Sequence, residues 1–478
     1  MSRTNDSIGC LPEEMQACIL SKLNGKTAAV AKKVCKLWNE IIKDLETFKN
    51  FWLHRCLQEI PPYTLVELTR LTQLSGGKES TLVELTKDWR TSLQIKLPWM
   101  FWREIYAEYS RCGYIVHGKE EQKEIHYFPT HSDITCLHIK DNVMYSGHAG
   151  GQVISWENLD EELHYELLYS HWKKVTDITG LDMAKTTRHI LLGELNNKII
   201  SSAKDRTIVM YNIDTESFFQ LEIEDHNTYE YVGYVRSWGK HFFASANTCS
   251  RGRQSVWKSK THSDEADQQD IISTDISAKV TAFAVWDGNV VLGDEKGNLF
   301  TGLNIFNLGD ALRLEANIGG YINSIFLLGE RVVCFTGDGL LHVSRYKEHY
   351  VFNKHDINKC LNKTPECVVI HGSVLAIGCR TGAVYMYHLP SDRDWDNLNL
   401  ATPSRVIQTS HDHINAVAIG DDGDGPYVVI ATEGCSFLLV KYRRQKASSK
   451  KTVLKEKYLR KSFWYSLDKN TSPWQFLS

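Results

Sequence analysis

Apolar residues recur every three or four positions through the first 110 residues of the chain. They are Met15, Ile19, Leu20, Leu23, Val30, Val34, Leu37, Trp38, Ile41, Ile42 and Leu45 near the start, and Trp99, Trp102, Ile105, Tyr106 and Tyr109 further on. Because side chains three and four apart share one face of an α-helix, this spacing predicts amphipathic helices. Gly25 separates the first two of them.

Beyond residue 112 the pattern changes to short apolar runs separated by turn residues, and it repeats seven times. Each unit contains an apolar strand, a tight turn, a second strand, a further turn and a third strand. These second turns contain Gly151, Arg206, Gly252, Gly297, Gly339, Gly382 and Gly434. Their spacing, roughly 40 to 55 residues with several strands per unit, is typical of β-propeller blades.

A ring of such units explains how each small sheet is stabilised. One unit alone exposes both faces and its edges, whereas units packed in a ring bury their faces against each other. A β-sandwich followed by further domains would not give seven similar units. We therefore predict an α + all-β multidomain fold, in which a helical head precedes a propeller of about seven blades. A strand from Tyr114–His117 or Glu124–Phe128 is expected to complete the last blade.

Composition and charge exclude several classes of protein. The 478 residues include 55 Lys and Arg against 58 Asp and Glu, and the net charge of −3 gives no reason to expect bulk nucleic-acid binding. The chain shows neither an apolar run long enough to span a membrane nor a secretory signal. The 12 cysteines form no Cys-x-x-Cys pair, which favours buried thiols over disulfides or zinc. We expect a cytoplasmic or nuclear protein without metal or cofactor.

One repeat carries a more detailed pattern. Residues 201–211 read Ser-Ser-Ala-Lys-Asp-Arg-Thr-Ile-Val-Met-Tyr, and His171 opens the same unit. This stretch resembles the Ser-Gly-Ser-x-Asp-x-Thr-apolar-Trp pattern of WD-repeat proteins. The resemblance implies a buried hydrogen-bonded chain within the blade, formed by His171, Ser201, Asp205 and Tyr211. The other repeats match weakly, so the seven-fold periodicity carries the resemblance of the whole body to a seven-bladed WD-repeat propeller.

The head contains a second pattern. Leu11-Pro12 is followed by Ile19-Leu20-x-x-Leu23, by Val34-Cys35-x-x-Trp38 and by a further Trp at position 52. This arrangement resembles the F-box, although residues 26–29 lack the acidic-apolar helix start that is usual in that family. The resemblance implies that the head binds a Skp-type adaptor. The adaptor-binding residues would be Leu11, Pro12, Ile19, Leu20, Leu23, Val34 and Trp38.

The alternative is that these helices only pack against residues 60–110 and the propeller. The head holds more large apolar groups than about 50 helical residues can bury alone, which favours a patch that faces a partner.

Together the two resemblances imply the substrate receptor of a Skp–cullin–F-box (SCF) ubiquitin ligase. We expect an F-box at residues 8–60, a helical linker acting as a rigid spacer at 61–111, a propeller at 112–443 and a basic tail at 444–478. Such a receptor is not an enzyme: it contacts the cullin scaffold through the adaptor and holds a protein substrate on the propeller. A propeller scaffold that works without a ligase remains an alternative. An enzyme using the central channel is a further alternative, but no cluster of ionisable residues supports it.

Cationic residues occur in turns that would line one rim of the propeller. They are Lys204, Arg206, Arg251, Arg253 and Arg380. Because Arg binds carboxylate and phosphate groups in a bidentate manner, these residues predict an acidic or phosphorylated peptide ligand. The alternative is scattered surface charge. Residues 441–461 hold ten Lys and Arg with one Glu, which is compatible with a solvated tail, a nuclear import signal or a phosphate-binding strip.

Two further groups have candidate chemistry. His131, His171 and His411 each open a repeat beside a polar turn, which favours structural hydrogen bonding over metal binding. Residues 421–425 read Asp-Asp-Gly-Asp-Gly but lack the ligand spacing and the closing Glu of a Ca²⁺ loop. We therefore expect a hairpin turn there.

Overall fold

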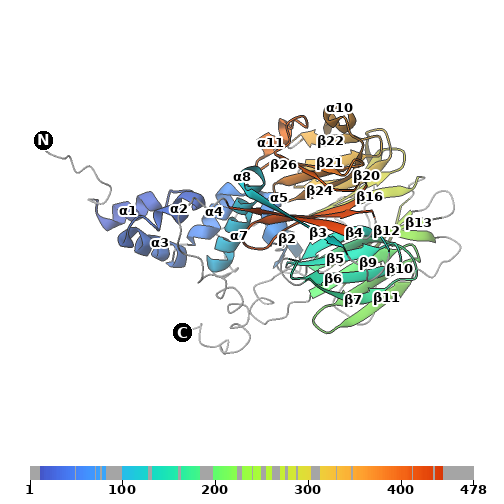
Figure 1. The fold of residues 1–478 in the computed structure, drawn as a ribbon, viewed down its shortest axis with the longest axis horizontal. Helices are drawn as coiled ribbons and strands as arrows, with labels where there is room; N and C mark the ends of the chain where they lie inside the picture. The colour runs from blue at the N-terminus through green and yellow to red at the C-terminus, as the bar shows by residue number, and fades with distance from the viewer. Residues whose placement is uncertain are drawn as a thin grey trace.

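The structure is a computed structural model of the full chain. It describes residues 11–444 except for 49, 70–71, 76–77, 82–98, 127–131, 141, 160–162, 183–196, 223–228, 239–240, 249–253, 261–269, 275–277, 287–288, 303–312, 330, 346–347, 412 and 434–435. In Figure 1 a helical head extends to one side of a β-propeller. The basic tail predicted from the sequence lies outside the described residues, apart from Arg444.

The head begins with four helices around one apolar core. They are α1 (Glu13–Leu20), α2 (Gly25–Ala31), α3 (Lys36–Phe48) and α4 (Phe51–Glu59). The Asn24 side chain caps α2 by accepting a hydrogen bond from the backbone N–H of Thr27 at 2.8 Å. The core of the head contains Ile41, Ile42 and Leu45 from α3, at the helical spacing seen in the sequence. The predicted helical head is therefore present.

The segment between head and propeller is helical at both ends. It contains α5 (Pro62–Thr69), a hairpin of β1 (Thr72–Ser75) and β2 (Lys78–Thr81), α7 (Trp99–Arg111) and the short α8 (Tyr114–His117). The hairpin corrects the expectation of a helical linker at residues 61–111, because this part of the linker is β-structure. Tyr114–His117, one candidate for the closing strand, is helical, so that candidate is wrong.

The described strands of the body form seven four-stranded antiparallel sheets, one for each repeat seen in the sequence. From the first blade to the seventh the strands are β4 (Ile134–Lys140), β5 (Val143–His148), β6 (Gln152–Glu157) and β7 (His164–Ser170); β8 (Val175–Asp182), β9 (Asn197–Ala203), β10 (Thr207–Asn212) and β11 (Ser217–Glu222); β12 (Tyr229–Trp238), β13 (His241–Thr248), β14 (Gln254–Lys260) and β15 (Asp270–Thr274); β16 (Val280–Trp286), β17 (Asn289–Asp294), β18 (Asn298–Gly302) and β19 (Arg313–Asn317); β20 (Ile322–Leu328), β21 (Arg331–Thr336), β22 (Leu340–Arg345) and β23 (Glu348–Asp356); β24 (Pro365–His371), β25 (Val374–Cys379), β26 (Ala383–His388) and β27 (Arg405–Gln408); β28 (Ile414–Asp421), β29 (Pro426–Thr432), β30 (Ser436–Arg443) and β3 (Lys119–His126). Two short helices, α10 (Ile357–Leu361) and α11 (Asp392–Asp396), lie in connections of the fifth and sixth blades.

The seventh blade joins the two ends of the propeller. Strand β3 pairs with β30 in a register that runs from Lys119 opposite Arg443 to His126 opposite Ser436. The inner strand β28 of this blade contacts the inner strand β4 of the first blade, so the ring is closed. The second candidate for the closing strand, Glu124–Phe128, overlaps β3, which begins five residues earlier than expected.

Each blade has a fourth, outer strand that the three-strand repeat did not predict. The outer strand β7 exposes four consecutive residues, and β19 is exposed at four of its five positions. Because both faces of such an edge strand meet solvent, its residues show no alternation of apolar and polar side chains. The second strands of the fifth and sixth blades, β21 and β25, are buried along their whole length. Their continuous apolar runs are the signal that identified the repeat in the sequence.

Candidate protein-interaction surfaces

Large apolar side chains are exposed on the first three helices of the head. Val30 and Val34 are each 62% exposed, Met15 is 52% exposed and Ile19 is 39% exposed. Leu37 on α3 is also exposed. Several exposed apolar side chains within about 25 residues of one small helical unit are typical of a surface that binds a partner. We call Met15, Ile19, Val30, Val34 and Leu37 the apolar face of the head.

The residues predicted to bind an adaptor divide into two groups. Pro12, Ile19 and Val34 are exposed, and Leu11 is half-buried. Leu20 is only 1% exposed, and Leu23 and Trp38 pack partly buried against the same core. The Trp38 indole N–H also donates to the Gln16 side chain at 2.8 Å.

The spacing of the motif did not separate the outward positions from the inward ones, because the motif combines both. Leu20 and Trp38 are thus parts of the head's own packing. Met15, Val30 and Leu37, which the sequence pattern placed only among helix-forming residues, belong to the apolar face.

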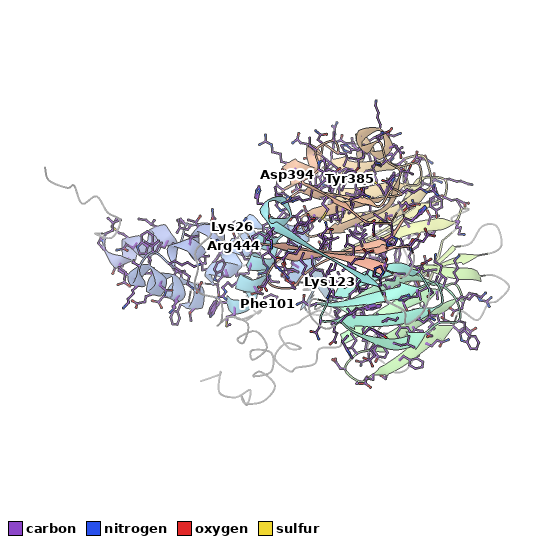
Figure 2. All side chains as sticks on the ribbon, in the orientation of Figure 1. Lys26, Phe101, Lys123, Tyr385, Asp394 and Arg444 are labelled. Atoms are coloured by element: carbon purple, nitrogen blue, oxygen red, sulfur yellow. The ribbon has the colours of Figure 1, made fainter. Side chains whose placement is uncertain are left out.

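Helix α5 contributes to the cores of both the head and the propeller, and α7 leads from the core of the head to a core of the propeller. On α5, Leu65 is buried in the core of the head, whereas Tyr63 is buried among residues of the fifth and sixth blades. On α7, Trp102 and Ile105 pack in the core of the head. Just beyond the end of α7, Cys112 lies in the core between the sixth and seventh blades. Figure 2 shows Phe101, from α7, on the head and Tyr385 and Asp394 on the propeller.

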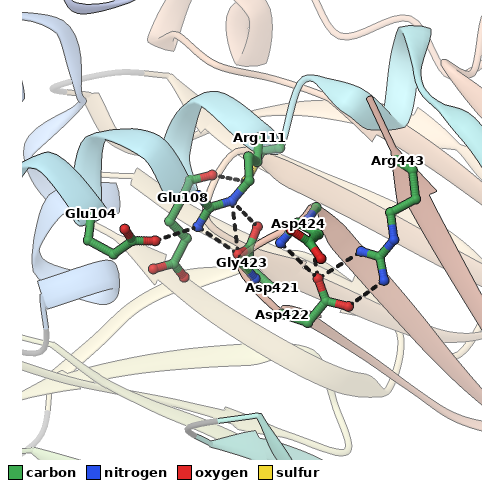
Figure 3. Close-up of polar contacts among 10 residues, drawn as sticks. Glu104, Glu108, Arg111, Asp421, Asp422, Gly423, Asp424 and Arg443 are labelled. Carbon is green, nitrogen blue, oxygen red and sulfur yellow. Dashed lines mark hydrogen bonds and ion pairs between the residues drawn. The ribbon is translucent and has the colours of Figure 1, made fainter. Parts of the chain in front are cut away.

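The last residue of α7 makes a nearly buried ion pair with the propeller. The Arg111 guanidinium donates to both carboxylate oxygens of Asp421, at 2.7 to 3.0 Å, and to Glu104 at 3.1 Å (Figure 3). The side chains of Arg111 and Asp421 are 10% and 5% exposed. Burial alone would lower the pKa of Arg111, but the hydrogen bonds and charges of Asp421 and Glu104 raise it.

Asp422, which follows Asp421, pairs with cationic residues of the propeller itself. Asp422 accepts two hydrogen bonds from Arg443, at 2.6 and 2.7 Å (Figure 3). It accepts a third from Lys441 at 3.0 Å. Burial alone would raise the pKa of Asp422, but Arg443 and Lys441 lower it to about 2. The sequence Asp-Asp-Gly-Asp-Gly is thus the turn between β28 and β29, as expected. Two of its three carboxylates, those of Asp421 and Asp422, bind cationic side chains of this chain.

Backbone groups add further contacts between the head and one rim of the propeller. The Gly372 N–H donates to Glu67 at 2.9 Å, and the Tyr109 hydroxyl donates to the Pro390 carbonyl at 3.1 Å. The Arg405 guanidinium donates to the carbonyls of residues 115 and 118 around α8, both at 2.9 Å. Residues 372, 390 and 421 lie in turns between first and second or third and fourth strands, which share one rim. We call this the head-side rim, and the opposite one the far rim.

The hydrogen-bonded chain predicted for the second blade is present with two changes: Thr207 is an additional member, and Tyr169 takes the place of Tyr211. His171 shares hydrogen bonds with Ser201 Oγ at 2.7 Å and Thr207 Oγ1 at 2.6 Å. The Thr207 hydroxyl donates to Asp205 at 2.6 Å. The Tyr169 hydroxyl bonds to Ser201 at 2.9 Å, whereas Tyr211, the predicted end of the chain, stacks against the Tyr169 ring with centroids 5.6 Å apart. Tyr169 lies on the neighbouring blade, so spacing within one repeat could not identify it.

The first blade contains a related chain that the sequence analysis did not assign. The Trp156 indole N–H donates to Ser146 Oγ at 2.7 Å, and Ser146 Oγ lies 2.9 Å from His148 Nε2. His131, expected to open this repeat, lies outside the described residues. A Ser-Gly-His triplet followed eight residues after its His by Trp was the signal for this chain.

Histidine also supports the closure of the ring. His411 Nε2 lies 3.1 Å from Glu124 Oε1 of β3 and 3.2 Å from Ser436 Oγ of β30. These residues stand beside a polar pocket of about 210 Å³ on the far rim. His171 and His411 therefore both take structural hydrogen bonds, as expected. Within the described ranges, no group of three or more His, Cys, Asp or Glu side chains could hold a metal ion.

The cations predicted to capture a ligand lie on the far rim where the structure describes them. Lys204 and Arg206 stand in the turn between β9 and β10, and Arg380 stands in the turn between β25 and β26. Arg380 is 3.9 Å from Glu366. Arg251 and Arg253 lie outside the described residues. The described cations thus come from two separate places, because the second and sixth blades are not neighbours.

The sequence analysis missed the most exposed large apolar residue among the described ones. Trp172, in the connection from β7 to β8, is 89% exposed on the far rim, next to the turn that holds Lys204 and Arg206. Its position between His171 and two lysines was visible in the sequence, but nothing in the repeat indicated which way the ring points. No helix of the described chain is long and apolar enough to cross a membrane.

Known proteins are similar to the helical head and to the propeller separately. The F-box domain model matches residues 8–50. No curated protein matches the chain. Among solved structures, the β-propeller domain of Myceliophteria thermophila Cps50 (Swd1) is 11% identical, with a TM-score of 0.50, over 68% of this chain and 99% of that one.

Two further structures are similar at lower scores. The WD40 β-propeller domain of Doa1 is 11% identical, with a TM-score of 0.49, over 69% of this chain and 98% of its own. The computationally designed protein Ika8 is 16% identical, with a TM-score of 0.45, over 67% and 100%. At such low identity, the likeness to the Cps50 domain shows the fold alone. The chain is thus an N-terminal helical F-box followed by a β-propeller.

Proposed function

We propose that this chain is the substrate-recognition adaptor of an SCF-type ubiquitin ligase. F-box domains generally bind Skp1-type adaptors, and propellers bind protein ligands. In this proposal the head binds the adaptor, which links the chain to the cullin scaffold, and the propeller holds a protein that is ubiquitinated and then degraded. The observation that supports this proposal is the apolar face of the head. Its large apolar side chains are exposed to solvent, whereas other apolar residues of the same helices are buried in the core of the head.

The chain itself is non-catalytic in this proposal. A conjugating enzyme carried by other subunits transfers ubiquitin, and the receptor raises the rate by holding the substrate nearby. A tethered lysine then reacts at an effective concentration far above its concentration in solution. Helices α5 and α7, which connect the core of the head to the propeller, support the predicted role of the linker as a rigid spacer. The proposed location is the cytoplasm, the nucleus or both.

Adaptor binding tests this proposal. We expect Ile19→Asp with Val34→Asp to abolish co-purification of a Skp-type adaptor, because charged groups replace exposed apolar ones at the centre of the contact. Since both positions are exposed, the double variant should keep the melting temperature of the wild type. Leu20→Ala is the matched control from the core. It should lower the stability of the head by about 2–5 kcal/mol because it leaves a cavity.

The result also decides between the proposal and its alternative. An adaptor that stays bound to the double variant would contradict this use of the apolar face. A wild-type chain that binds no adaptor, while its propeller still captures a protein, would favour a ligase-independent scaffold.

A further inference from the structure

The far rim carries one aromatic residue in an unusual setting. Trp172 is 89% exposed, although burying a large aromatic ring is normally favourable. Its backbone N–H donates to Asp205 Oδ2 at 2.7 Å, and the neighbouring His171 N–H donates to the Gly151 carbonyl at 2.9 Å. The backbone of the loop is thus held by hydrogen bonds at residues 171 and 172. An exposed aromatic side chain that projects from a fixed backbone is typical of an interface anchor.

Cationic residues lie in the loop of Trp172 and in the adjoining loop. Lys173, Lys174 and Lys204 are exposed, and Arg206 is half-exposed. The two loops that carry them are joined, because the Lys204 N–H donates to the Lys174 carbonyl at 2.9 Å. The acidic residue of these loops, Asp205, is already hydrogen-bonded, and its pKa is lowered. Burial alone would raise that pKa, but hydrogen bonds from His171, Thr207 and the Trp172 backbone outweigh it. We call Trp172, Lys173, Lys174, Lys204 and Arg206 the Trp172 patch.

Arg206 occupies a backbone position at which other blades have glycine. Arg206 has φ 71°, in the left-handed region. At the equivalent turn of four other blades this position is glycine, with φ between 72° and 94°: Gly151, Gly297, Gly339 and Gly382. A non-glycine residue in this conformation costs about 1 kcal/mol or more. Arg206 therefore has a strained backbone conformation, which glycine would adopt without strain.

We propose that the Trp172 patch binds an extended acidic segment of a protein partner, with one apolar side chain of that segment packed on the Trp172 ring. This inference rests on the proposed function, since it assigns the substrate class of the receptor. The charges of the patch complement carboxylates, and the ring supplies apolar contact between them. The patch lies on the rim opposite the head, so a segment bound there does not compete with the contacts of α5 and α7.

The pattern favours a peptide over single-stranded nucleic acid. Proteins that bind single strands stack successive bases on several aromatic residues along a basic groove. The Trp172 patch offers one fully exposed ring. Tyr321, another exposed aromatic residue on this rim, lies between the fourth and fifth blades, far around the ring from the first and second.

Fluorescence anisotropy with purified full-length chain tests the inference. The probe is a labelled ten-residue peptide of glutamates with one central phenylalanine. Two comparison probes replace the phenylalanine by serine or the glutamates by lysine. We expect the first probe to bind, the serine probe to bind several-fold more weakly, and the lysine probe not to bind. Binding of the first probe should weaken as salt is raised, because the contacts between its carboxylates and the lysines are exposed.

Variants assign this binding to the patch. Lys173→Glu with Lys204→Glu, and separately Trp172→Ala, should weaken binding of the first probe at least about tenfold. The matched controls are Lys296→Glu with Lys359→Glu, and Tyr321→Ala. All three positions are exposed in connections on the same rim, Lys359 within the short helix α10. They should leave binding unchanged.

Arg206→Gly separates binding from folding. It removes a cation and also relieves the left-handed strain, so we expect a higher melting temperature together with weaker binding of the probe. If this variant binds like the wild type, or if the control variants lose as much binding as the patch variants, the inference is wrong. If an oligothymidine 12-mer binds through the patch more tightly than the acidic peptide does, nucleic acid is the ligand and the inference also fails. Adaptor binding is measured separately, so loss of one function does not imply loss of the other.

Discussion

Single carboxylates in the turn from β28 to β29 have different tasks. Asp421 binds Arg111 of the helical segment, whereas Asp422 binds Arg443 and Lys441 of the propeller's last strand. The two residues are adjacent in sequence and have the same chemistry, so only the positions of their partners distinguish them. Adjacent carboxylates of one turn can thus have different roles. Asp421 pairs with the helical segment, and Asp422 pairs with a strand of its own sheet.

The pH dependence of stability should change when Asp422 is replaced. The pKa of Asp422 is lowered from 3.8 to about 2, so the unfolded chain binds more protons at this site between these values. The contribution is therefore fully present above about pH 4 and is lost as the pH falls towards 2. Asp422→Asn should remove this acid-sensitive contribution, on the order of 1 kcal/mol after allowance for partial exposure. Urea unfolding at pH 3 and pH 6 measures it. An unchanged difference between the two pH values would contradict the assignment.

Helix α7 acts as one strut between two cores. Its first half packs in the core of the head, and its last residue, Arg111, pairs with Asp421 of the propeller. Helix α5 makes a second attachment through Tyr63 and Glu67. Two attachments at different blades oppose rotation about either helix. They are what the proposed role of the linker as a rigid spacer requires.

Removing Arg111 should weaken this strut. Arg111→Ala leaves the carboxylate of Asp421 nearly buried without its guanidinium, which typically costs about 3 kcal/mol. Asp424→Asn is the matched control, because it removes an exposed carboxylate from the same turn and should change the free energy of unfolding by less than about 0.5 kcal/mol. Chemical denaturation measures both. Equal effects would show that the ion pair with Arg111 adds nothing beyond surface charge.

The sequence predicted elements whose signal is local. The helices of the head were predicted from apolar residues three and four positions apart, and the buried strands were predicted from continuous apolar runs. The structure contains both kinds of element. The outer strands were missed because they are exposed on both faces. Arg111 and Asp421 are 310 residues apart, so no local pattern joins them. The F-box motif indicated which residues belong together, but whether Leu20 or Ile19 faces a partner depends on how the helices pack.

The whole molecule behaves as two units with a shared boundary. Closure of the ring by β3 lies within the propeller's own sequence, so a fragment of residues 112–478 keeps all seven sheets. The same fragment loses α5 and α7, and with them the contacts that Glu67, Tyr109 and Arg111 make with the head-side rim. We expect this fragment to fold with a lower melting temperature than the propeller in the full chain.

The effect of Asp421→Asn should then change sign between the two proteins. In the full chain the substitution removes the ion pair with Arg111 and should lower stability. In the 112–478 fragment the same carboxylate has lost Arg111, so the substitution should raise the melting temperature or leave it unchanged. Calorimetry of the four proteins measures this. A destabilisation of equal size in both would mean that Asp421 acts inside the propeller rather than across the boundary.

The pairing of β3 with β30 also fixes the order in which the molecule can be completed. During synthesis the head emerges first, and β3 follows it, but the partner strand ends at Arg443, near the end of the chain. The seventh blade therefore cannot form until almost the whole propeller has left the ribosome, and such long-range pairings fold slowly. Asp421 is also synthesised late. Until then Arg111 of α7 has no Asp421 to pair with, whereas the apolar face of the head is already synthesised. If the head binds an adaptor as proposed, that adaptor can engage the growing chain before the propeller is complete enough to bind a ligand.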